Sequence, residues 1–199
     1  MARRADHSPE ELRELILETA ADLAREGGLR AIAMRRIGER IGYSPGSIYN
    51  ALGDLDDVIL HLNGRTLLHL THRLEVAVGG LSDPRQRAMA LTDAYLSVAR
   101  DERALWSILF EYSLPPDREL PQWYADAMAR PVEVVAQSLG PIFADETEAH
   151  RSVAALWAAL HGVASLATSG KLRLVSEEDP NALARALVAR YLGFEPPGT

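Results

Sequence analysis

Residues 34–53 combine arginine, hydroxyl-bearing and small side chains in a pattern suited to nucleic acid. Arginine guanidinium groups can reach backbone phosphates, and serine, tyrosine and asparagine can donate hydrogen bonds to phosphates or base edges. A glycine near the start of a short helix has no side chain, so the backbone can approach a ligand closely there. The candidate DNA-contacting residues are Arg35, Arg36, Ser44, Pro45, Gly46, Ser47, Tyr49 and Asn50.

The same stretch predicts two short helices joined by a tight turn. Apolar residues spaced through residues 34–41 indicate one buried helical face. Gly42 supplies a left-handed helix stop, because it has no Cβ to clash there. Ser44 and Pro45 are typical of a helix start, and the second helix runs to about Leu52. This is the layout of a helix-turn-helix, whose second helix enters the major groove.

Simpler interpretations of these residues stay open. Ser44 could act only as a helix cap and Tyr49 only in packing, and each arginine could be a solvated charge. Arg3 and Arg4 precede the first helix and could touch a minor groove or phosphates, or form a solvated tail.

Charge distribution supports a basic region on an acidic protein. The whole chain has a formal net charge of −7, which by itself argues against nucleic acid. Between Gly27 and Gly53, however, four arginines stand against Glu39 alone, a local charge of +3 (four minus one). We therefore expect modest DNA affinity with a strong dependence on salt.

Composition excludes several classes of protein. The 199 residues are 47% hydrophobic and contain no cysteine, which excludes disulfides, thiolate nucleophiles and cysteine-based zinc sites. Residues 1–14 contain no apolar run typical of a signal peptide, and no later stretch is apolar enough to span a bilayer, so we expect a cytoplasmic protein. His69 and His72 are three residues apart but lack a third ligand, so no metal is expected.

Helical periodicity continues through the rest of the chain, and strand signals are absent. Ser8 and Glu11 form a capping-box pattern at the first helix, and a long helix over residues 54–79 follows the helix-turn-helix. We predict an all-α fold of about nine helices. Residues 1–53 form a DNA-binding domain, and residues 54–199 form a helical ligand-binding and dimerisation domain linked to it by the long helix.

Aromatic residues gather in the helices expected to surround a cavity in the second domain. Aromatic residues at helical spacing also occur in ordinary cores, and His161 could be a hydrogen-bonded core or interface residue, so both interpretations stay open. The candidate ligand-binding residues are Trp106, Phe110, Tyr112, Trp123, Tyr124, Trp157 and His161. The ligand would be an unidentified small molecule, and no cofactor is expected.

The last two long helices predict a homodimer. Apolar residues nearly encircle the helix that contains residues 156–162, and the final helix adds further apolar surface that is too large to leave in water. A two-fold dimer with a four-helix bundle would bury both helices. The candidate interface residues are Leu156, Leu160, Leu183, Leu187 and Tyr191.

Residues 28–62 resemble the N-terminal domain of the TetR family of bacterial transcriptional regulators. The residues that carry the resemblance are Arg35, Ile37, Gly42, Ser44, Gly46, Ser47, Ile48, Tyr49, Asp56, Asp57 and Val58. Trp157, His161 and Gly162 resemble a C-terminal domain of this family named for Trp-His-Gly. The resemblance implies a homodimeric repressor that binds a palindromic operator and releases it when a small molecule enters the second domain.

Departures from the family pattern at Ala33, Ala51, Leu52 and Leu55 keep alternatives open. Ala33 and Leu55 remove groups that often touch phosphates, so the chain could instead be a helical partner-binding adaptor. An all-α enzyme is a further alternative, motivated by Asp54 and the two aspartates that follow it. No nucleophile elbow, phosphate loop or dinucleotide fingerprint is present, so no catalytic residue is expected.

Overall fold

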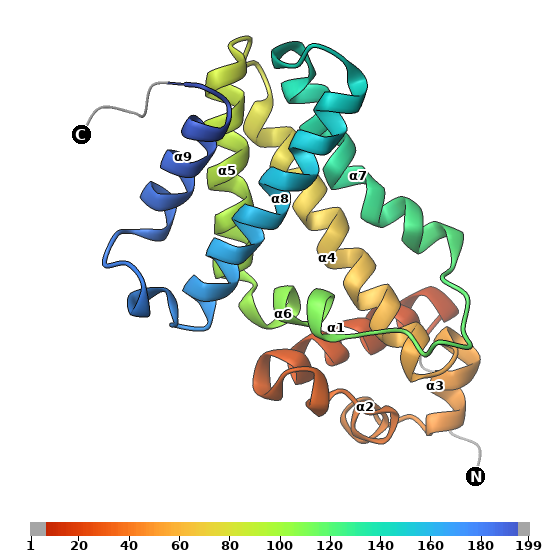
Figure 1. Ribbon diagram of the computed structural model, residues 1–199. Helices are drawn as coiled ribbons and strands as arrows, with labels where there is room; N and C mark the ends of the chain where they lie inside the picture. The colour runs from red at the N-terminus through yellow and green to blue at the C-terminus, as the bar shows by residue number, and fades with distance from the viewer. Residues whose placement is uncertain (1–6, 195–199) are drawn as a thin grey trace. The chain divides into compact units, whose positions relative to one another are not determined.

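The computed structural model describes residues 7–194 of the chain (Figure 1). This part contains nine α-helices, three single-turn 3₁₀ helices and no β-strand, which confirms the all-α prediction. None of the helices in residues 7–194 is long and apolar enough to cross a membrane. The α-helices are α1 (Pro9–Gly27), α2 (Met34–Ile41), α3 (Pro45–Leu52), α4 (Leu55–Val78), α5 (Pro84–Asp101), α6 (Arg103–Glu111), α7 (Gln122–Leu139), α8 (Glu146–Thr168) and α9 (Pro180–Tyr191). The 3₁₀ helices are η1 (Leu29–Ala31), η2 (Gly140–Ile142) and η3 (Leu172–Leu174).

The helices divide into two compact units. The first unit contains the chain up to Thr66 together with Ala104–Tyr124. The second unit contains Leu67–Arg103 and the chain from Ala125 onward. All of α6 except its first residue therefore belongs to the unit that holds α1, α2 and α3, and the domain boundary at residue 53 stays a prediction. Helix α4 contributes its N-terminal half to the first unit and its C-terminal half to the second.

A capping box fixes the N-terminal end of α1. The Ser8 hydroxyl accepts a hydrogen bond from the Glu11 N–H (3.2 Å), and the Glu11 carboxylate accepts one from the Ser8 N–H (2.7 Å). These reciprocal bonds satisfy two donors that a helix N-terminus leaves unpaired. They also hold the pKa of Glu11 below its usual value. The predicted capping box is confirmed.

The turn between α2 and α3 also forms as local chemistry dictates. Gly42 ends α2 with φ of 75°, in the left-handed region that glycine adopts without a steric penalty. The Ser44 hydroxyl then caps α3 by accepting a hydrogen bond from the Ser47 N–H (3.1 Å), and Pro45 occupies the first turn. Ala33, at the N-cap position of α2, has no side-chain oxygen and makes no such bond.

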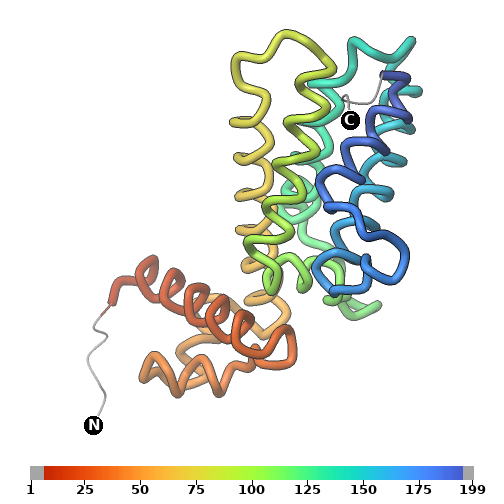
Figure 2. Tube along the Cα trace, turned by 90° about the vertical axis from the view of Figure 1, so that its left-hand side faces the viewer, coloured from red at the N-terminus to blue at the C-terminus, as the bar shows by residue number. Residues whose placement is uncertain are grey.

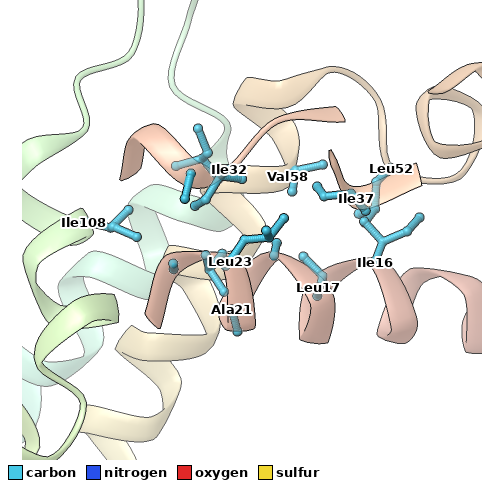
Figure 3. Close-up of a cluster of buried hydrophobic side chains, with 14 of the residues drawn as sticks. Ile16, Leu17, Ala21, Leu23, Ile32, Ile37, Leu52, Val58 and Ile108 are labelled. Atoms are coloured by element: carbon cyan, nitrogen blue, oxygen red, sulfur yellow. The ribbon is translucent and has the colours of Figure 1, made fainter. Parts of the chain in front are cut away.

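The core of the first unit joins the three N-terminal helices to α4 and α6. Ile16 and Leu23 of α1, Ile37 of α2 and Ile48 of α3 are completely buried. Figure 3 shows several of these side chains gathered on one face of α1, with Ile108 of α6 at one end of the cluster. Fully burying a side chain of this size contributes about 1.5–3 kcal/mol each, so this cluster holds the short α2 and α3 in place.

The second unit is a bundle in which α5, α8 and α9 pack on one another. Figure 2 shows these three helices running side by side. Tyr95 and Val98 of α5, Val153 of α8 and Val188 of α9 are buried. At the edge of the bundle, Arg185 of α9 pairs with Asp93 of α5, with 3.3 Å between Nη2 and Oδ2.

Candidate nucleic-acid interface and ligand cavity

One face of α3 presents predicted DNA-contacting residues to solvent. Pro45, Gly46 and Asn50 are exposed, and 61% of the Tyr49 surface is accessible, a large fraction for an aromatic residue. Ile48 points the other way and is completely buried. The helix is therefore held by its apolar face while its opposite face is available to a partner.

Ser44 and Ser47 are tied to the capping arrangement of α3. Their hydroxyl oxygens lie 2.9 Å apart, and the Ser44 oxygen also accepts the Ser47 N–H. Ser44 therefore caps α3, as the helix-start pattern predicted. Each hydroxyl group has one proton to donate, and one of the two protons is used in the contact between the serines, so one serine proton remains for a phosphate.

The arginines near α2 are exposed but already paired. Arg35 pairs with Glu39 (2.9 Å between Nε and Oε1), and Arg36 donates to the Ala31 carbonyl (3.1 Å). Arg40 pairs with Glu26 of α1, a residue outside the stretch used to count local charge. The positive charge available to a partner is therefore smaller than the sequence count of +3. Because exposed ion pairs contribute only about 0–1 kcal/mol, phosphates could readily replace these carboxylates.

Two features of this surface were not predicted from sequence. The Tyr43 hydroxyl lies 2.8 Å from Nδ1 of His7, which joins the start of the described chain to the turn before α3. Gly38 of α2 is buried, and a Cβ atom there would lie 2.5 Å from the carbonyl oxygen of Tyr43. The contact between His7 and Tyr43 joins residues 36 positions apart, so the sequence gives no sign of it. A glycine inside a helix with apolar periodicity, such as Gly38, does indicate that another part of the chain packs closely against the helix. Arg3 and Arg4 lie outside the described residues.

Substitution of two glycines should separate close packing from exposure. Gly38→Ala is expected to lower the free energy of unfolding by about 1–3 kcal/mol, because its methyl group would overlap a backbone oxygen. Gly46→Ala is the matched control, since the nearest atom to its Cβ would be 3.7 Å away. There, alanine should leave stability unchanged or raise it by up to about 1 kcal/mol. Urea denaturation followed by circular dichroism measures both values, and equal effects would contradict the role given to Gly38.

Arg118, in the segment between α6 and α7, forms an ionic cluster with three aspartates at the N-terminus of α4. Arg118 donates to both carboxylate oxygens of Asp54 (2.8 Å each), to Asp56 (3.3 Å) and to Asp57. The guanidinium group holds the pKa of Asp54 below its usual value, and the carboxylates raise the pKa of Arg118. Asp54 and Asp57 also cap α4, each accepting the other's N–H at 3.0 Å. The three aspartates therefore have a structural role.

Arg118→Ala should destabilise the protein by about 1–2 kcal/mol at pH 7, because three neighbouring carboxylates lose their shared cation. Arg100→Ala, which removes an exposed pair with Asp101, should cost less than about 0.5 kcal/mol. The Asp54 contribution is complete above the usual aspartate pKa of about 3.9 and is lost as pH falls through its lowered folded-state pKa. Urea denaturation at pH 7 and at pH 3.5 or below should therefore show the Arg118→Ala effect shrinking in acid.

A cavity lies within the second unit, surrounded by α4, α5, α7, α8 and α9. The empty space inside it is about 560 Å³, a figure that includes the part open to solvent. Val132 of α7 and Trp157 of α8 line it and have 36% and 42% of their surface exposed. The cavity therefore opens to solvent beside these two residues.

Most of the aromatic residues predicted to bind a ligand do not line this cavity. Trp106 is buried beside the exposed Phe110 (ring centroids 5.3 Å apart), and Trp123 stacks on His61 (4.6 Å). These residues, together with Tyr112 and Tyr124, belong to the first unit. Of the seven candidates, Trp157 is the one that lines the cavity.

Trp157 and His161 lie together on α8, one turn apart. Their rings stack with centroids 5.6 Å apart and an interplanar angle of 10°. Nδ1 of His161 lies 3.4 Å from the Tyr95 hydroxyl, and Tyr95 lines the cavity. Burial lowers the pKa of His161, so the neutral imidazole is favoured.

The residues predicted at a dimer interface fall into two groups. Leu156 and Leu160 line the cavity, and Leu156 is only 4% exposed, so its surface is already used within the chain. On α9, Leu183 and Leu187 are half-buried and Tyr191 is 48% exposed. Between residues 151 and 166, the exposed residues of α8 are mostly small: Arg151, Ala154, Ala155, Trp157, Ala158, Ser165 and Leu166.

His69 and His72 are both exposed on α4. Among residues 7–194, no group of three or more histidine or acidic side chains is arranged to hold a metal ion.

Solved structures share the fold across nearly the whole chain. A protein of unknown function from Rhodococcus sp. RHA1 superposes with a TM-score of 0.78 at 22% identity, covering 96% of this chain and 98% of its own. The TetR family regulator PfmR from Thermus thermophilus gives 0.62 at 18% identity, covering 90% and 97%. A predicted transcriptional regulator from Saccharomonospora viridis, crystallised with choline, gives 0.69 at 21% identity, covering 92% and 96%. No curated protein matches the sequence.

Sequence models of one family match both ends of the chain. Residues 16–53 match the model described as bacterial regulatory proteins of the tetR family, which covers most of α1 together with α2 and α3. Residues 88–191 match the tetracyclin repressor-like C-terminal domain, which runs from α5 to the end of α9. The finer resemblance to the Trp-His-Gly type stays a prediction. With a helix-turn-helix DNA-binding domain at one end and this C-terminal domain at the other, the chain belongs to the TetR family of bacterial transcriptional regulators.

Proposed function

We propose that the protein is a homodimeric repressor that binds a palindromic DNA operator and releases it when a small molecule occupies the cavity of the second unit. The observation that carries this proposal is the exposure of Tyr49 and Asn50 on α3. The apolar face of the same helix is buried in the core of the first unit. A surface of this kind fits a major groove, where the first residues of a recognition helix meet base edges and phosphates. Such a protein would act in the cytoplasm, where bacterial DNA lies.

The exposed faces of α8 and α9 support a homodimer. Small residues along α8 allow a second helix to approach closely, and Leu183, Leu187 and Tyr191 of α9 supply apolar area beside them. A two-fold axis through these helices would form a four-helix bundle from two copies. A symmetric dimer also doubles the DNA contacts at a fixed spacing, which a single short helix cannot do.

The cavity supports control by a small molecule. It lies in the second unit, whereas α3 belongs to the first. The Saccharomonospora viridis structure with choline is an example of a protein of this fold crystallised with a small organic molecule. A ligand can weaken DNA binding only if it prefers a dimer geometry whose two recognition helices no longer match the operator. Helix α4 has residues in both units, so we assign it the coupling role.

Selection from a random pool of double-stranded DNA tests the proposal. The purified protein is mixed with the pool at two salt concentrations, binding is followed by fluorescence anisotropy, and the retained fraction is sequenced. Enrichment of a palindrome, with affinity falling steeply as salt increases, is the expected result. Retention of no sequence by a folded, dimeric protein would reject the repressor.

A partner-binding adaptor is the second candidate, and two observations favour it. Ala33 has no hydroxyl group to offer a phosphate at the start of α2, and Arg35 and Arg40 each have a carboxylate partner that a phosphate would have to displace. Both would weaken phosphate binding. A dimer that retains no DNA in the selection would support this alternative.

A further inference from the structure

The wall of the cavity is almost entirely apolar. Leucine, valine, alanine and proline side chains from five helices make up most of it, and Thr92, Tyr95 and Trp157 supply its polar atoms. None of the described residues that line it carries a formal charge. The charged residues Asp93 and Arg185, on two of the surrounding helices, pair with each other and do not line the cavity.

This wall discriminates against charged compounds. An ion that leaves water must be paired or hydrogen-bonded, because the cost of removing it from water otherwise exceeds what an apolar wall returns. Here an ammonium or carboxylate group would meet leucine and valine side chains with no counter-charge among the lining residues. An uncharged hydrophobic compound gains from the same contacts.

Tyr95 offers a hydrogen-bonding position in this wall. Its hydroxyl group lies 3.4 Å from Nδ1 of His161, near the long end of the hydrogen-bond range. Burial raises the pKa of Tyr95 and lowers that of His161, so both groups are neutral at pH 7. The Thr92 hydroxyl donates its proton to the Ala88 carbonyl at 2.8 Å.

We propose that the cavity binds an uncharged, mainly hydrophobic small molecule whose hydroxyl or carbonyl group hydrogen-bonds to the Tyr95 hydroxyl. The inference rests on the proposed function only in treating this cavity as the effector site. Binding itself requires neither DNA nor release from an operator.

Three compounds with the same chain length test the charge preference: 1-octanol, octanoate and octylammonium. Isothermal titration calorimetry at pH 7 with the full-length protein should show 1-octanol binding at least about 10-fold more tightly than either ion. Tyr95→Phe should weaken the binding of 1-octanol by about 3- to 10-fold, the loss of one hydrogen bond. Tyr43→Phe, which removes a tyrosine hydroxyl in the first unit, is the matched control and should leave the affinity unchanged.

Two substitutions at Val132 locate the binding. This residue is exposed at the mouth of the cavity, so the fold should tolerate replacement, and circular dichroism checks that it does. Val132→Trp should obstruct the mouth and weaken 1-octanol binding. Val132→Glu should place a carboxylate there and raise the affinity for octylammonium by about 10-fold.

The inference is overturned if either ion binds as tightly as 1-octanol, if none of the three compounds binds at millimolar concentration, or if the Val132 variants change nothing. It fails separately from the proposed function. Binding of 1-octanol without any selected DNA operator would support the ligand class and reject the repressor. A palindromic operator combined with tight octanoate binding would support the repressor and reject the ligand class.

Discussion

Tyr49→Ala should lower the affinity for the selected operator by at least about 100-fold. The side chain stands on the exposed face of α3, one turn from the Pro45–Gly46 start of the helix, where its hydroxyl group can donate to a phosphate. A hydrogen bond to a charged group contributes about 1.5–3 kcal/mol, and a symmetric dimer would lose it twice. Fluorescence anisotropy with the labelled operator measures the loss.

Companion variants separate the causes of this loss. Tyr49→Phe keeps the ring, so it should reproduce most of the effect if the hydroxyl group contacts phosphate. Leu120→Ala removes another exposed hydrophobic side chain of the first unit and should leave DNA affinity unchanged. Operator binding by Tyr49→Ala within about twofold of the wild-type affinity would remove Tyr49 from the interface.

A glutamate at Leu187 should convert the dimer into a monomer. The two-fold symmetry of the proposed bundle would bury two copies of the new carboxylate, and unpaired buried charges cost several kcal/mol each. Light scattering should then report a mass near 21.8 kDa in place of twice that value. The monomer should also lose most of its operator affinity, because a single recognition helix keeps only half of the contacts.

Leu187 is half-buried within its own chain, so a second variant guards against simple unfolding. Ala158→Glu lies on the exposed side of α8 and should give the same monomer with an unchanged circular dichroism spectrum. Val76→Glu, at an exposed position of α4, is the control that should remain dimeric. If both interface variants keep the wild-type mass, the α8–α9 interface is rejected.

Local chemistry made the N-terminal elements predictable from sequence. The Ser8–Glu11 box, the Gly42 stop and the Ser44 cap each depend on residues within four positions of one another, and all three form as expected. The all-α class followed for the same reason, since helical periodicity is read within a few turns.

Packing between distant segments could not be predicted in this way. The apolar face of α6 indicates burial but does not specify a core, and the structure places Ile108 with α1 and α2. Aromatic residues at helical spacing were the candidates for ligand binding in the sequence. The cavity, however, is lined mainly by leucine and valine side chains from five helices, whose apolar periodicity is the same as that of any core residue. The local charge count likewise overlooked Glu26, which pairs with Arg40 from outside the counted stretch.

The position of Trp157 gives the protein a built-in optical reporter. Of the three tryptophans, Trp106 is shielded from water at 3% exposure, Trp123 belongs to the first unit, and Trp157 stands at the mouth of the cavity. Indole emission shifts with solvent polarity and is quenched by iodide only where water can reach the ring. In a Trp123→Phe background, which removes the other exposed indole, a compound that fills the cavity should therefore turn the emission bluer and protect it from iodide, so occupancy can be followed in solution without attaching a dye.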